Sequence, residues 1–176
     1  MNLVIETERL ILRKMRLSDA EAMFKLDSNP NVVKYLGNTP FTSIGESINL
    51  INNISNQYLK NGIGRFSVVL KETNEVIGWA GIKFVTEPEN NQTHFYDLGY
   101  RLQEEHWGKG YATEATRAWL DYAFQTMNLH VVVASVNVDN FNSNKIVQKF
   151  GFQLRSQFYY GDIYCNWYEL KNPNII

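Results

Sequence analysis

A glycine-rich segment carries the clearest chemistry in this sequence. Gly108 and Gly110 stand one residue apart, and Ala112 follows two residues later. Small residues in such a segment let a phosphate approach the backbone closely, whereas a bulky side chain would stand in the way. If a helix begins here, its first N–H groups lack partners within the helix and its dipole favours an anion. By itself, the spacing fits either a phosphate site or a simple tight turn.

The flanking residues predict the elements that such a site needs. A strand is expected over Tyr96–Gln103, and a helix is expected from the glycines to about Met127. One face of this helix is apolar, with Ala112, Ala115, Trp119, Leu120, Ala123, Phe124 and Met127. A second, shorter helix is expected over Asn140–Phe150, where Asn140 suits the N-cap and Gly151 the C-terminal cap.

The rest of the chain predicts one layered domain over residues 1–176. Ser18 with Glu21 and Ser43 with Glu46 have the spacing of capping boxes, so each pair predicts a helix start. Strands are expected at 10–13, 66–71, 76–85, 131–138, 152–160 and 163–170. Helices followed by strands, and then by alternating elements, indicate a mixed α/β or α+β sheet.

Composition excludes several classes of protein. The 17 basic and 18 acidic residues give a net charge of −1, which disfavours nucleic-acid binding. Cys165 is the only cysteine, and no spacing of histidines and carboxylates suggests a metal. The longest aliphatic run, Val131–Ala134, is far below the roughly 18 residues of a membrane span. The N-terminus lacks the pattern of a signal peptide, so a cytoplasmic protein without membrane association is expected.

Several segments together resemble one enzyme family. Trp107–Ala115 resembles the acetyl-CoA pyrophosphate loop of the GNAT N-acetyltransferases. Segments similar to the branch that acetylates N-terminal amines of ribosomal proteins are Thr7–Arg13, Val76–Gly81, Leu98–Leu102, Asn140–Asn144 and Lys149–Phe152. The resemblance implies a GNAT fold, with a mostly antiparallel sheet of about seven strands splayed around the CoA site and about four helices.

The same resemblance assigns residues to acetyl-CoA. It implies that the pyrophosphate is held by Trp107, Gly108, Lys109, Gly110, Tyr111, Ala112 and Thr113. Trp107 departs from the glutamine or arginine of the family pattern, and Lys109 either adds charge or is simply solvated. Leu102 is expected to pair with the pantetheine arm as an added strand would. Asn140 and Ser143 match positions that face CoA from the other side.

Attack of an amine on a thioester needs a base for the amine and a proton for the leaving thiolate. Asp97 is the expected base, acting through water; its alternative role is an ion pair with Arg101 on the same strand face. Val147 occupies the position of the tyrosine that serves as the acid in many members of the family. Ser143 is the nearest replacement, and unplaced alternatives are Tyr159, Tyr160 and Tyr164.

Three functions are compatible with these residues. The first is acetylation of a protein N-terminal amine, the second is acetylation of a small amine such as a polyamine, amino acid or antibiotic. The third is a CoA-binding sensor without turnover, which the valine at position 147 leaves open. The oligomeric state is expected to be a monomer or a homodimer, since the last hairpin can leave an exposed edge strand.

Overall fold

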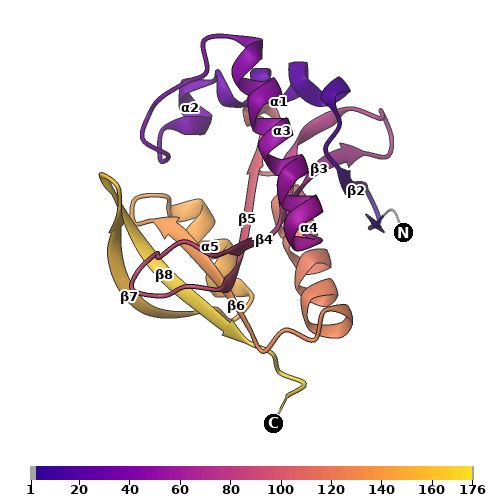
Figure 1. Cartoon of the computed structure of the whole chain (residues 1–176). Coiled ribbons are helices and arrows are strands. Elements are labelled where there is room, and N and C mark those ends of the chain that lie inside the picture. Colours follow the sequence, from indigo (N-terminus) through magenta and orange to yellow (C-terminus); the bar gives the residue numbers. More distant parts are fainter. Residues whose placement is uncertain (1–2, 176) are drawn as a thin grey trace.

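The computed structural model describes residues 3–175, and its strands form a single eight-stranded sheet (Figure 1). The strands are β1 (Val4–Glu6), β2 (Leu10–Lys14), β3 (Arg65–Leu70), β4 (Val76–Val85), β5 (Phe95–Leu102), β6 (Val131–Asn137), β7 (Gln153–Tyr160) and β8 (Ile163–Lys171). Their order is β1-β2-β3-β4-β5-β6-β8-β7, and only β5 and β6 are parallel neighbours. The expected mixed, mostly antiparallel sheet is confirmed. The strand beyond the expected seven is β1, whose three residues carry too little pattern to predict it.

Five α-helices accompany the sheet in the described residues, against about four expected. They are α1 (Ala20–Asp27), α2 (Pro30–Val33), α3 (Ile44–Asn61), α4 (Tyr111–Asp121) and α5 (Phe141–Lys149). A π-helical turn, Tyr122–Thr126, continues α4 to the place where its helix was expected to end. Within residues 3–175, no helix has both the length and the apolar character needed to cross a membrane.

Local capping fixes the start of α3 and of the 3₁₀ turn that precedes α1. The expected box at α3 is confirmed, since the Glu46 carboxylate accepts the Ser43 backbone N–H at 2.9 Å. The expected box of Ser18 with Glu21 is wrong. Residues 17–19 form a 3₁₀ turn, and the Asp19 carboxylate accepts the Arg16 backbone N–H at 3.0 Å. Asp19, not Glu21, is therefore the capping carboxylate. Arg13 also donates to the Asp19 carboxylate, at 2.7 Å, and helps to hold it in place.

The core fixes the start of α4 at the end of β5. Ala115, Trp119 and Ala123 are fully buried, as the apolar face of this helix predicted. The Trp119 ring meets Phe66 of β3 edge to face, with ring centroids 4.9 Å apart, a favoured aromatic geometry. The helix also packs on β4 and β5, so its first turn has a fixed position relative to the sheet.

The sheet splits between β5 and β6. Asp97 with Val133 is the single residue pair between these two strands. Figure 1 shows β6, β7, β8 and α5 on one side of the split and α1 and α3 on the other. Beyond the pair, β5 has no strand beside it on that edge, so the split leaves room between the two parts of the sheet.

Candidate active site

A cavity of about 1260 Å³ follows the split. It reaches from the glycine segment, along β5 and α5, to side chains of β3, β4 and β8. Ordinary small-molecule sites hold roughly 300–1,000 Å³, so this cavity can take an extended ligand together with a second molecule.

The glycine segment lies at one end of the cavity. Gly108 and Gly110 have φ of 72° and 83°, in the left-handed region that side-chain-bearing residues rarely adopt. Gly110 directly precedes the first residue of α4, so the free N–H groups of the helix open toward the cavity. Of the residues expected around the pyrophosphate, those that line the cavity are Trp107, Gly108, Gly110, Tyr111, Ala112 and Thr113. Lys109 is exposed and does not line it.

The N-terminal residues hold this segment in place. The Arg9 guanidinium donates to the Lys109 carbonyl at 2.9 Å and to the Glu114 carboxylate at 2.7 Å. The same carboxylate accepts the Arg9 backbone N–H at 2.8 Å and the Thr7 hydroxyl at 2.5 Å. Arg9 also lies 4.5 Å from the centroid of the Tyr111 ring. These contacts, termed here the Arg9–Glu114 clamp, join the start of β2 to the first turn of α4.

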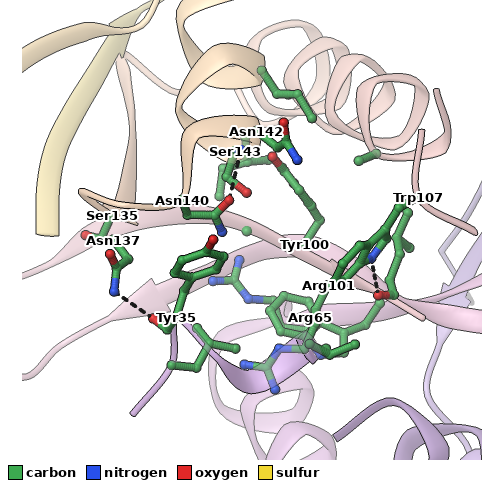
Figure 2. Close-up of a pocket in the computed structure, with 18 of the residues that line it drawn as sticks. Tyr35, Arg65, Tyr100, Arg101, Trp107, Ser135, Asn137, Asn140, Asn142 and Ser143 are labelled. Carbon is green, nitrogen blue, oxygen red and sulfur yellow. Dashed lines mark hydrogen bonds between the residues drawn. The ribbon is translucent and has the colours of Figure 1, made fainter. Parts of the chain in front are cut away.

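Trp107 closes the turn from the other side. Its indole N–H donates to the Leu102 carbonyl at 2.8 Å, as Figure 2 shows, and the side chain is 45% exposed. Leu102 is the last residue of β5 and lines the cavity. The expected departure from the family pattern at position 107 therefore has a structural use, since an indole reaches across the turn to the strand end.

α5 forms the opposite wall of the cavity. The Asn140 side chain accepts the Ser143 backbone N–H at 3.2 Å, which confirms the predicted N-cap. Asn144 anchors the helix, since its amide donates to two backbone carbonyls and its oxygen accepts from Asn166 and Tyr168 at 2.8 Å each. Asn140 and Ser143 line the cavity, whereas Val147 is buried in the core and does not.

Tyr100 is a cavity residue that sequence reasoning missed. It lies on β5, and its hydroxyl points toward Ser143 and Asn142 (Figure 2). Burial raises the pKa of Tyr100 to about 12, and the nearby Ser143 hydroxyl opposes this shift. The two hydroxyls do not reach hydrogen-bonding geometry, so the buried phenol has no partner among the described residues. A free hydrogen-bond donor therefore faces the cavity beside Ser143.

Asp97 lines the cavity farther from the glycines, and its partner differs from the expected one. Its carboxylate is bound by the Arg65 guanidinium and lies 4.0 Å from the Lys83 ammonium. Arg101, the expected partner, instead pairs with the buried Asp27 of α1. The prediction failed because Arg65 comes from β3, two strands away, where neighbours along β5 give no clue.

Arg65 occupies space that a missing side chain provides. A Cβ atom on Gly99 would lie 2.8 Å from a guanidinium nitrogen of Arg65. Arg65 and Arg101 also lie 5.2 and 5.1 Å from the ring centroid of Trp79. A charge directly before the β-prone run 66–70 needs a partner if the strand is buried, and that signal could have pointed to Arg65 from the sequence.

Glu89 is a second carboxylate at the same end of the cavity. It belongs to the connection between β4 and β5. Burial raises the pKa of Glu89, and the negative charge of Asp97 adds to this shift. The described residues contain no group of three or more side chains suited to a metal ion. The cavity thus has a glycine-rich end at the start of α4, a wall bearing hydroxyls, and an end with carboxylates.

Comparisons with known proteins agree on one family. The profile of the acetyltransferase (GNAT) domain matches residues 9–153. N-acetyltransferase p20 of Bacillus licheniformis is 40% identical over 147 residues, which cover 84% of this chain and 80% of that protein. Spermidine N(1)-acetyltransferase of Vibrio cholerae is 27% identical over 145 residues, with 82% and 79% covered. The structure of RimL, a ribosomal L7/L12 alpha-N-protein acetyltransferase, in complex with coenzyme A has a TM-score of 0.77 at 20% identity, covering 96% of this chain and 98% of that one.

Proposed function

The chain belongs to the GNAT family of N-acetyltransferases, and from this premise we propose that it transfers the acetyl group of acetyl-CoA to the primary amine at a protein N-terminus. The observation that carries the proposal is the continuous cavity from the α4 start to the carboxylates at Asp97 and Glu89. Family membership makes the protein an acyltransferase, which disfavours a CoA-binding sensor without turnover. We also propose that residues 1–176 form a single acetyltransferase domain.

The residues present fit acetyl-CoA. The left-handed turn at Gly108 and Gly110 and the free N–H groups of α4 suit a pyrophosphate. The open edge of β5 suits the extended pantetheine arm, which can add to a strand through its amides. Asn140 and Ser143 border the same channel from α5. When bound, acetyl-CoA supplies an activated acetyl group, and the chain positions it between these walls.

The proposed roles of the side chains follow from position. Asp97, the base predicted from the sequence, lies at the carboxylate end of the cavity, where the proton of the amine would be taken, and Ser143 is the predicted donor toward the sulfur. Holding both reactants in one channel also lowers the barrier, because an oriented pair reacts without the entropic cost of an encounter. The alternative acceptor is a small polyamine, because a spermidine acetyltransferase is among the relatives and because carboxylates attract a cationic amine.

The proposal is tested by thiol release from acetyl-CoA with peptides bearing free N-termini and with small amines. We expect kcat/KM to be higher for the peptides than for the small amines. A higher kcat/KM for polyamines would support the alternative acceptor. Absence of turnover with every amine, despite CoA binding, would contradict both.

The cofactor site is tested separately with Gly110→Glu. A side chain at this left-handed position would strain the turn and place a negative charge where the pyrophosphate binds, so CoA binding measured by calorimetry should be lost. Gly62→Glu is the matched control, since Gly62 has φ of 73° and caps α3 away from the cavity. Unchanged affinity in the folded Gly110→Glu variant would contradict the assignment.

A further inference from the structure

Glu89 bridges the two parts of the split sheet at the carboxylate end of the cavity. The backbone of Glu89 forms an isolated antiparallel bridge with Gln92 in the connection between β4 and β5. Its side chain is half-buried and lines the cavity. Its Oε1 accepts the hydroxyl of Ser135, on β6, at 3.2 Å. This carboxylate lines the same end of the cavity as Asp97.

Each element around Glu89 presents a polar or charged group. Asp97 of β5 and the Cys165 thiol of β8 lie nearby, and burial followed by the charge of Glu89 raises the pKa of that thiol to about 11. Lys83 of β4, the Ser135 hydroxyl and Arg65 of β3 favour the ionised form of Glu89. Burial and Asp97 prevail over them, so the pKa of Glu89 lies above that of an ordinary glutamate.

Glu89 and Asp97 differ in how free their oxygens are. The Asp97 Oδ2 atom is bound by Arg65 and also faces Lys83. Among the described residues, the side chain of Glu89 makes a single hydrogen bond, from a neutral hydroxyl, and no salt bridge. A base must accept a proton that it can hold near the working pH, so the carboxylate without a cation partner is the better suited of the two.

We propose that Glu89 is the general base that takes the proton from the ammonium group of the acceptor, while the Arg65–Asp97 pair fixes the charge around it. The inference rests on the proposed acetyl transfer. The ammonium gives one proton to Glu89 and becomes a neutral amine. Its nitrogen then forms a bond to the thioester carbonyl carbon, the carbon–sulfur bond breaks, and the second nitrogen proton reaches the thiolate. Glu89 returns its proton to solvent.

The test compares Glu89→Gln, Asp97→Asn and the exposed control Glu87→Gln in the same loop. The kcat/KM for the preferred amine is measured against pH, and CoA affinity and thermal unfolding are measured alongside. Glutamine preserves the bond from Ser135, so the variant should fold, lose roughly 10²-fold or more in rate, and lose the acidic limb of the profile. Glu87→Gln should match the wild type.

Ser135→Ala supplies a second measurement, the position of the acidic limb, which would not change if Glu89 had only a structural role. The serine hydroxyl lowers the pKa of Glu89, so its removal should raise that pKa and shift the acidic limb to higher pH with the plateau retained. An acidic limb that persists in Glu89→Gln, or one that disappears only in Asp97→Asn, would overturn the inference. Those outcomes leave the acetyl transfer intact, whereas a wild type inactive with every amine would end both proposals.

Discussion

At the scale of single residues, Tyr100 changes the expectation for the leaving group. The Tyr100 phenol is buried beside Ser143, and its pKa is raised to about 12. A thiol has a pKa near 8.5, roughly three units lower, so this phenol does not readily give its proton to a thiolate. It can instead stabilise the departing sulfur through a hydrogen bond that requires no reorganisation, as donors do in an oxyanion hole. Val147 then needs no acidic substitute at its own position.

Tyr100→Phe tests this role. The variant keeps the ring and removes the donor, so kcat should fall roughly 10²-fold while CoA affinity stays unchanged. Stopped-flow measurement of thiol release and calorimetry with CoA separate the two effects. Tyr159→Phe is the control, because Tyr159 is 70% exposed. If kcat falls only in Ser143→Ala, then the serine is the donor and Tyr100 merely packs.

Residues with local signatures could be predicted from the sequence, and residues with distant partners could not. Gly110 and Asn140 act through the backbone of the next few residues, so their spacing predicted their places. Arg65 meets Asp97 across 32 positions, and Glu89 meets Ser135 across 46. Asp97 lines the cavity, but its partner Arg65 depends on the order of the strands, which spacing along the sequence does not reveal.

At the scale of elements, the Arg9–Glu114 clamp connects the N-terminal strands to the cofactor end. Thr7 and Arg9 were noted only as part of a family-like segment, and the structure gives them a mechanical role. Burial disfavours the charged carboxylate of Glu114, but hydrogen bonds from Thr7 and Arg9 outweigh it and lower its pKa. The clamp therefore holds the glycine turn in one geometry before the ligand arrives, which reduces the cost of ordering on binding.

Glu114→Gln tests the clamp. The glutamine loses the charge that binds Arg9, so the turn should become less ordered and the Kd for CoA should rise about tenfold, or roughly 1.4 kcal/mol. Equilibrium binding by calorimetry measures the change. Glu8→Gln removes the same charge from an exposed neighbour and should leave the Kd unaltered. A lowered melting temperature with unchanged Kd would mean that the clamp supports the fold only.

At the scale of the whole molecule, the sheet is incompletely paired between β5 and β6. One residue pair joins β5 to β6, whereas antiparallel ladders join the other neighbouring strands. The two parts are otherwise held by side chains of the core and by hydrogen bonds such as those of Glu89 with Ser135 and of Asn90 with Ser156. A cofactor lying along β5 and against α5 would add contacts to both parts at once.

CoA should therefore stabilise the folded protein and reduce motion between the two parts of the sheet. At a concentration 100 times its Kd, a ligand that binds only the folded state adds about 2.7 kcal/mol to the free energy of unfolding. Denaturant titration measures that gain, and hydrogen exchange should slow in β5 and α5 together. Protection confined to the glycine turn would show that CoA does not span the split. Gly110→Glu, which is expected not to bind CoA, should show neither effect.

The close approach of Arg65 to position 99 has a consequence for how this sequence can change over generations. Gly99 lacks the Cβ atom that would collide with the guanidinium, so an alanine there is compatible only with a displaced or shortened residue 65. The displaced guanidinium would in turn leave the buried Asp97 with only the Lys83 ammonium, 4.0 Å away, as a counter-charge. Substitutions at 65, 97 and 99 should therefore be strongly epistatic, and a lineage could alter the three positions only along a few permitted orders of mutation.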